Sequence, residues 1–146
     1  MAKNQVLPAP KNHCFGCGKQ NPQSMRLKFN YNASTRQVAS RFRLSRRYSG
    51  PPGYCHGGII ATILDEAMAK LNKPNQVTAV TAQMIVDYLK PVPLNKPLHA
   101  EAHEIRTSGR RRFRTAAILN EEGIVLARGR GVFITFDPHK MFGRSV

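Results

Sequence analysis

One run of helical periodicity, residues 59–71, constrains the fold more than any other feature of this sequence. Pro74 follows it and predicts that the helix ends near Asn72. Large apolar residues recur in the run at the spacing of one face of an amphipathic helix: Ile59, Ile60, Ile63, Leu64, Ala67, Met68 and Leu71. The rest of the chain must therefore supply the surface that covers this apolar side.

Strand patterns surround the predicted helix. Before it, apolar and polar residues alternate over residues 25–31 and again over 36–44. After it come strand-like segments at 77–90, 98–106, 111–120 and 124–136. Gly129 and Gly131 in the last segment predict a β-bulge or a close backbone approach.

This order of elements predicts the fold class. One early helix followed by strands at hairpin spacing favours an α+β fold, with an antiparallel sheet packed on one helix. Residues 1–24 are rich in Pro, Asn, Gln and Lys and predict an irregular N-terminal arm. A single domain is expected over residues 25–137, with a C-terminal tail over 138–146.

The charge balance points to an anionic partner. The 146 residues carry a formal net charge of +15, from 23 Lys and Arg against 8 Asp and Glu. Such a field attracts polyanions, either nucleic acid or a phosphate-rich small molecule, although a solvated basic surface remains the alternative. We expect a cytoplasmic protein without a membrane span, because no long apolar run and no signal-peptide pattern is present.

His56, Gly57 and Gly58 stand at the predicted start of the helix. The first amides of a helix have no acceptor within it, and they carry the positive end of the helix dipole. Glycine adds no Cβ, so a ligand oxygen can come close to these N–H groups and be stabilised as an oxyanion. A tight turn into a core helix is the simpler alternative.

Asp65 lies about two turns further along, in line with Gly58. It falls outside the large apolar arc, beside Ala61 and Ala69, where small side chains would let another chain or a ligand approach. A carboxylate there can attack a carbonyl or activate a water, or it can simply make a structural hydrogen bond. Glu66 points elsewhere and is interpreted as an ordinary surface residue.

The stretch "HGGIIATILDEA", residues 56–67, resembles the signature of the hotdog-fold acyl-CoA thioesterases, in their PaaI-like branch. In that family His-Gly-Gly opens the central helix, and the catalytic acid stands nine residues after the histidine, as Asp65 does after His56. Three other stretches are similar to family elements, and the likeness covers about residues 13–136: "CFGCGKQNPQSMRLKF", "VTAQMIVDYLKPVPL" with its Tyr-x-x-Pro pattern, and "TSGRRRF".

The resemblance implies a hotdog fold, in which an antiparallel sheet wraps around one long helix. It also implies acyl-CoA hydrolysis without a cofactor, by a homodimer or homotetramer whose sites combine two subunits. Asp65 would be the nucleophile or general base. The Gly57 N–H would polarise the thioester carbonyl, with Gly58 as a second candidate donor, and His56 would shape the turn.

Thr81 matches a hydroxyl that some family members place beside the acid, although threonine also suits any strand. Strand alternation puts Gln83 on the same face, so either side chain is a candidate for orienting the attacking water. The resemblance places a basic hairpin with its tip at Ser108 and Gly109 over the phosphates of CoA. Lys90 is assigned to the same substrate-binding group.

Arginines dominate that hairpin: Arg106, Arg110, Arg111, Arg112 and Arg114. Guanidinium groups bind phosphate in a forked geometry, so phosphate binding would explain the excess of positive charge. A solvated turn is the alternative. Arg110 and Arg111 are the predicted CoA contacts.

One position departs from the family pattern. Many relatives carry Asn or Gln six residues before the motif histidine, and here that position is Gly50. A non-catalytic protein that binds acyl-CoA or an acyl carrier is therefore the alternative function. Nucleic-acid binding is a weaker third hypothesis, since only the charge supports it and no recognised nucleic-acid motif is present.

Cys14 and Cys17 form a Cys-x-x-Cys pair. His13, Cys55 or His56 could supply further ligands, but a closed zinc site usually needs four and the sequence has no second Cys-x-x-Cys. We therefore predict no metal site. Two buried thiols in a packed turn are the favoured interpretation, and three cysteines fit a reduced protein.

Overall fold

The apolar run over residues 59–71 forms helix α1 (Gly57–Ala69) in the computed structural model, which describes residues 10–142. Five of its residues are buried on the side that faces the sheet: Ile60, Ile63, Leu64, Ala67 and Met68. The predicted helix is confirmed, and a series of turns carries the chain from Ala69 past Pro74. In the part of the chain that the structure describes, no helix is long and apolar enough to cross a membrane.

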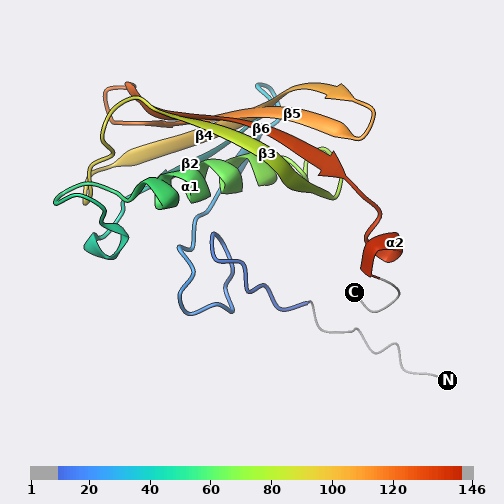
Figure 1. Cartoon of the computed structure of the whole chain (residues 1–146), viewed down its shortest axis with the longest axis horizontal. Helices are drawn as coiled ribbons and strands as arrows, with labels where there is room; N and C mark the ends of the chain where they lie inside the picture. The colour runs from blue at the N-terminus through green and yellow to red at the C-terminus, as the bar shows by residue number, and fades with distance from the viewer. Residues whose placement is uncertain (1–9, 143–146) are drawn as a thin grey trace.

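A six-stranded sheet curves around this helix, as Figure 1 shows. Its order is β1-β2-β4-β5-β6-β3, every neighbouring pair is antiparallel, and β3 forms one edge. The strands are β1 (Asn30–Asn32), β2 (Gln37–Phe42), β3 (Ala79–Tyr88), β4 (Leu98–Ser108), β5 (Arg111–Leu119) and β6 (Val125–Thr135). A 3-10 helix (Arg46–Tyr48) and the short α2 (Pro138–Phe142) complete the elements. The predicted α+β class is confirmed.

The strand predicted over residues 25–31 is wrong for most of its length. Only β1 forms there, because Arg26 has a φ of +54°, which is incompatible with an extended strand. Met25 and Leu27 instead donate their backbone N–H groups to carbonyls of the N-terminal segment, Phe15 and Gly16. Residues 1–9 of the predicted arm and 143–146 of the predicted tail lie outside the described residues.

Two glycines let α1 lie close to the sheet. A Cβ on Gly129 would lie 3.3 Å from the Leu64 Cβ. One on Gly131 would lie 2.9 Å from Phe133 and 3.0 Å from the Met68 sulfur. The close backbone approach predicted for Gly129 and Gly131 is confirmed, while the register shifts of the sheet occur elsewhere.

Arg114 ties the end of α1 to the sheet from a fully buried position, with 0% of its surface exposed. Its Nη1 donates to the Met68 carbonyl at 2.9 Å and to Asn72 Oδ1 at 2.7 Å, and its Nε donates to Glu104 at 3.2 Å. Burial lowers the pKa of Arg114, and the adjacent Glu104 carboxylate partly offsets this. The guanidinium therefore links strand, helix and following turn.

Replacing Arg114 by leucine should destabilise the protein strongly, because Asn72 Oδ1, the Met68 carbonyl and the Glu104 carboxylate would each lose a guanidinium donor. The expected loss in free energy of unfolding is about 3–5 kcal/mol. Urea denaturation measures it, with the exposed Arg111→Leu as the matched control, expected within about 0.5 kcal/mol of the parent. A loss below about 1 kcal/mol for Arg114→Leu would contradict this role.

Candidate active site

His56 caps the start of helix α1. Its backbone is extended (φ −62°, ψ 137°), and its Nδ1 accepts a hydrogen bond from the Gly58 N–H at 2.9 Å. The geometry agrees with the turn-shaping role predicted for His56. It also argues against Gly58 as a second donor to substrate, because its amide already has an acceptor.

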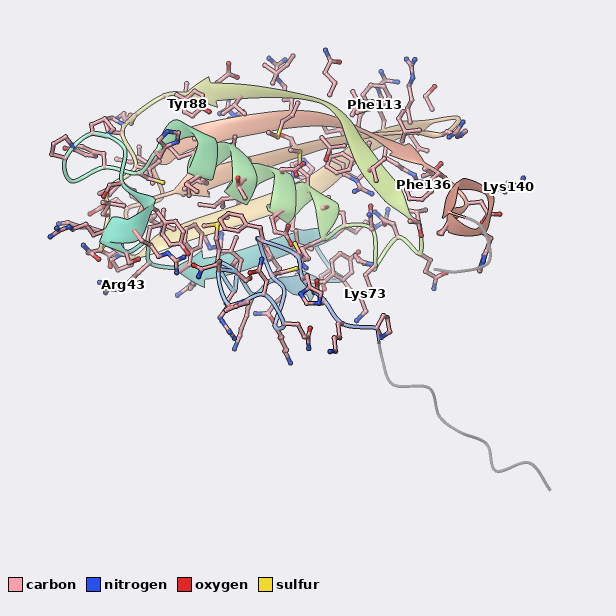
Figure 2. All side chains as sticks on the ribbon, turned by 60° about the horizontal axis from the view of Figure 1, so that its bottom comes forward. Arg43, Lys73, Tyr88, Phe113, Phe136 and Lys140 are labelled. Carbon is pink, nitrogen blue, oxygen red and sulfur yellow. The ribbon has the colours of Figure 1, made fainter. Side chains whose placement is uncertain are left out.

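The Gly57 N–H is different. Among residues 10–142 it has no hydrogen-bond acceptor, and it lies at the positive end of the helix. Tyr88 donates its hydroxyl to the Gly57 carbonyl at 2.9 Å, and a Cβ on Gly57 would lie 3.5 Å from the Tyr88 ring. Figure 2 shows Tyr88 beside the start of the helix. The site thus offers one unused backbone donor held in a fixed orientation.

Asp65 pairs with Thr81, as the resemblance implied. The threonine hydroxyl on β3 donates to Asp65 Oδ1 at 2.5 Å. Among the described residues no group donates to Oδ2, and the carboxylate is only half-buried. One oxygen of Asp65 is therefore fixed and the other is available for chemistry.

Gly57 and Asp65 cannot act on the same carbonyl within one copy of the chain. They are eight residues apart on a continuous helix, which is about 12 Å along its axis. A carbonyl that accepts from the amide while it reacts at the carboxylate needs both groups within about 3–3.5 Å of its atoms. Either the two groups serve different purposes, or two copies combine.

The shared face predicted for Thr81 and Gln83 is wrong. Thr81 is paired with the buried Phe133, and a register shift then pairs Gln83 with Val132, the next residue of β6. Because alternate residues of β6 face opposite sides, Gln83 points away from the helix and from Asp65. The sequence carried no sign of this bulge.

The basic hairpin forms where it was predicted, between β4 and β5. Ser108 pairs with Arg111 across a two-residue loop in which Gly109 has a φ of +58°. The Arg110 Nε donates to the Thr135 carbonyl at 2.9 Å, which fixes the guanidinium at the end of β6.

The five arginines of the hairpin do not act together. Arg112 and Arg114 both bind the Glu104 carboxylate, and Arg114 is buried beyond the reach of a ligand. The Arg106 guanidinium stacks 3.8 Å from the centre of the Phe113 ring. Three arginines remain exposed for phosphate: Arg106, Arg110 and Arg111.

Lys90 lies far from this hairpin in the same copy. It follows the end of β3 at Tyr88, whereas the hairpin lies beside the beginning of β3, across β6. The ten residues of β3 separate the two by about 30 Å. Lys90 is thus near Gly57, and the hairpin is near Thr81 and Asp65.

Gly50 has a structural explanation. A Cβ at this position would lie 2.9 Å from His56 Cα and 3.2 Å from its backbone nitrogen. The Gly50 N–H donates to the Tyr54 carbonyl, which closes the loop tightly against the helix start. The asparagine or glutamine of many relatives does not fit this backbone.

Two residues matter more than the sequence suggested. Tyr88 was visible only as part of a Tyr-x-x-Pro pattern, and its bond to Gly57 connects segments 31 residues apart. The ordinary surface position predicted for Glu66 is wrong, because its side chain is only 13% exposed and pairs with Lys70 at 3.2 Å. Within residues 10–142 the only group of three potential metal ligands is Glu66 with Cys14 and Cys17.

Comparisons with known proteins agree with this architecture. The family model of the thioesterase superfamily matches residues 52–127, more than half of the chain. The chain therefore belongs to the thioesterase superfamily. The crystal structure of another thioesterase superfamily protein superimposes with a TM-score of 0.79 at 27% identity, covering 84% of this chain and 60% of that one. The predicted hotdog fold and superfamily are confirmed.

Two further relatives are informative. Acyl-coenzyme A thioesterase THEM4 of Rattus norvegicus is 30% identical over 111 residues, 75% of this chain. The chain spans only 48% of that relative's length. The BH2602 protein of Bacillus halodurans, solved with CoA, has a TM-score of 0.68 at 24% identity, covering 79% of this chain and 77% of that protein.

Proposed function

We propose that this member of the thioesterase superfamily hydrolyses acyl-CoA thioesters to CoA and a carboxylic acid. The observation that carries the proposal is the presence on one helix of an unused terminal amide, Gly57, and a carboxylate, Asp65, whose Oδ2 has no donor among the described residues. The name of the rat relative and the CoA in the BH2602 structure support the substrate class.

Gly57 acts on the carbonyl. Its N–H donates to the thioester oxygen, and this bond strengthens as negative charge develops in the tetrahedral intermediate. Tyr88 keeps the peptide in place through the Gly57 carbonyl, so the donor needs no reorganisation during the reaction. His56 occupies the neighbouring Gly58 amide and thereby leaves Gly57 as the single donor.

Asp65 supplies the second half of the chemistry. Its Oδ2 either removes a proton from the attacking water or attacks the carbonyl carbon itself. In both routes the carbon–sulfur bond breaks, CoA leaves as a thiol after gaining a proton, and water provides the new carboxyl oxygen. Thr81 holds Oδ1 so that Oδ2 stays directed at the substrate.

The active unit is a homodimer, in which Gly57 comes from one copy and Asp65 from the other. β3 is an edge strand, and its residues Val80, Ile85 and Tyr88 are 47–55% exposed. A long exposed edge strand with apolar side chains is suited to pairing with another strand. Antiparallel pairing of two β3 strands about a two-fold axis brings the Tyr88 end of each copy to the Thr81 end of the other.

The same arrangement gathers the cationic groups. Arg110 and Arg111 lie near the Asp65 end of one copy, and Lys90 lies near the Gly57 end of the second. The nucleotide phosphates of CoA would bind there, with Ser108 and Gly109 at the loop and the acyl chain directed between the helices. The tetramer is a further step of the same assembly.

Gly50 favours the alternative of a non-catalytic acyl-CoA-binding protein. Its lack of a side chain removes a group that helps many relatives to hold the water or the carbonyl. In that case CoA would raise the melting temperature without any acyl-CoA being hydrolysed.

Two substitutions at Gly57 test whether its backbone N–H is needed for catalysis, because one removes this donor and the other keeps it. Gly57→Pro removes the donor, and proline is favoured at the first position of a helix when the preceding residue is extended, as His56 is. We expect kcat to fall about 10²–10³-fold with an unchanged melting temperature. Gly57→Ala keeps the N–H and places its Cβ in ordinary contact with Tyr88, so it should retain activity. Equal activity of the two variants would refute the role of the amide.

Asp65 and Thr81 are tested with a panel of acyl-CoAs of different chain length. Asp65→Asn keeps the shape but lowers kcat about 10²-fold or more, because the base or nucleophile is lost. Thr81→Val removes the hydrogen bond and should lower kcat about tenfold, whereas the matched Thr81→Ser should not. If Asp65→Asn hydrolyses any acyl-CoA at the parent rate, the catalytic assignment fails. If the parent binds CoA but hydrolyses none, the binding function replaces it.

A further inference from the structure

A second polar cluster lies on the side of α1 away from the sheet. The Lys70 ammonium lies 2.8 Å from the Cys17 sulfur and 3.2 Å from Glu66. Cys14 donates its S–H to Glu66 Oε2 at 3.6 Å. The two sulfurs and a Glu66 oxygen all lie within 4.8 Å of one another, and both cysteines are only half-buried. None of these groups has a part in the hydrolysis proposed above.

The cluster is better suited to thiol chemistry than to a metal ion. Cys14, Cys17 and Glu66 are the only potential ligands that converge there within residues 10–142, one fewer than a closed zinc site needs. The Lys70 ammonium already contacts two of these three potential ligands, Cys17 and Glu66. A divalent cation would therefore have to displace the ammonium and bind with an incomplete set of ligands.

Two features set this pair apart from ordinary packed thiols. Their sulfurs contact the charged side chains of Glu66 and Lys70, and the Cys-x-x-Cys spacing places both cysteines on one turn of the chain. A lysine ammonium stabilises a thiolate, and the thiolate is the form that attacks disulfides. The Glu66 carboxylate is a local acceptor for the Cys14 proton.

We propose that Cys14 and Cys17 form a site of reversible oxidation, closing to an intramolecular disulfide when they meet an oxidised low-molecular-weight thiol such as glutathione disulfide. One protein thiolate attacks the small disulfide and releases one molecule of glutathione. The second thiolate then attacks the mixed disulfide, forms the Cys14–Cys17 bond and releases the other. Two protein thiols are oxidised by two electrons, one glutathione disulfide is reduced, and the two protons pass to the released thiols.

Closing the disulfide changes how the N-terminal segment is attached to α1. The Cys14 S–H that binds Glu66 disappears, and Cys17 becomes a weaker acceptor for Lys70. Gly16, between the two cysteines, packs so closely on Glu66 that a Cβ there would lie 2.6 Å from Oε2. The bonds from Met25 and Leu27 to this segment are therefore expected to open more often in the oxidised protein.

Cys55 provides an internal control. It is 5% exposed, and burial raises its pKa to about 11, so little thiolate exists at neutral pH. Burial and the Glu66 carboxylate also raise the pKa of Cys17, and the Lys70 ammonium opposes them. Oxidation by a small disulfide should spare the buried Cys55, whereas Cys14 and Cys17 are half-buried and their sulfurs lie close enough to bond to each other.

The experiment equilibrates the full chain in glutathione buffers of increasing disulfide content, then alkylates under denaturing conditions and measures intact and peptide masses. The expected product has lost two hydrogens, keeps one alkylated cysteine at Cys55, and contains a linked Cys14–Cys17 peptide. Cys55→Ser should close equally well, and Cys14→Ser and Cys17→Ser should not close. Lys70→Met should slow closure severalfold compared with Lys70→Arg.

Hydrogen exchange then tests the coupling to the helix, with faster exchange expected at the Met25 and Leu27 amides of the oxidised protein. Three results would overturn the proposal. Cys14 and Cys17 could both stay alkylatable at every buffer composition. The protein could contain stoichiometric zinc that Cys14→Ser and Cys17→Ser lose, which would make the cluster a metal site. Or the disulfide could form while the exchange of both amides stays unchanged.

Discussion

The close packing of α1 on β6 is the constraint on which the rest of the structure depends. Gly129 and Gly131 remove the side chains that would otherwise hold the helix away, and Arg114 fixes its far end from inside the core. Because this contact is closely packed, α1 cannot shift along β6 by one residue. Since β6 pairs with β3, this contact also sets the position of the helix relative to β3. The short hydrogen bond between Asp65 and Thr81 depends on that position.

The first turn and the middle of this helix carry different parts of the proposed chemistry. Its first turn presents an amide held by His56 and Tyr88, and its middle presents a carboxylate held by Thr81. A rigid helix keeps these parts about 12 Å apart, so in the proposed mechanism a second copy brings them together. The exposed edge of β3 supplies a surface along which that can happen.

Patterns that repeat along the chain were predictable, and contacts between distant segments were not. The period of residues 59–71 identified α1, and strand-like runs at hairpin spacing identified the four strands after it. The bulge beside Thr81 reversed the direction of Gln83, because one inserted residue changes the face of all that follow. Glu66 was misjudged since its partner Cys14 is 52 residues away, and Arg114 looked like a phosphate ligand although it is buried.

The most direct measurement of the central claim mixes two inactive variants. Asp65→Asn and Gly57→Pro proteins are co-expressed, and thioesterase activity of the mixture is compared with that of each variant alone. In a composite site, each mixed dimer contains one complete site, so random assortment restores about a quarter of the parent activity. A mixture no more active than the two variants measured separately would contradict the account.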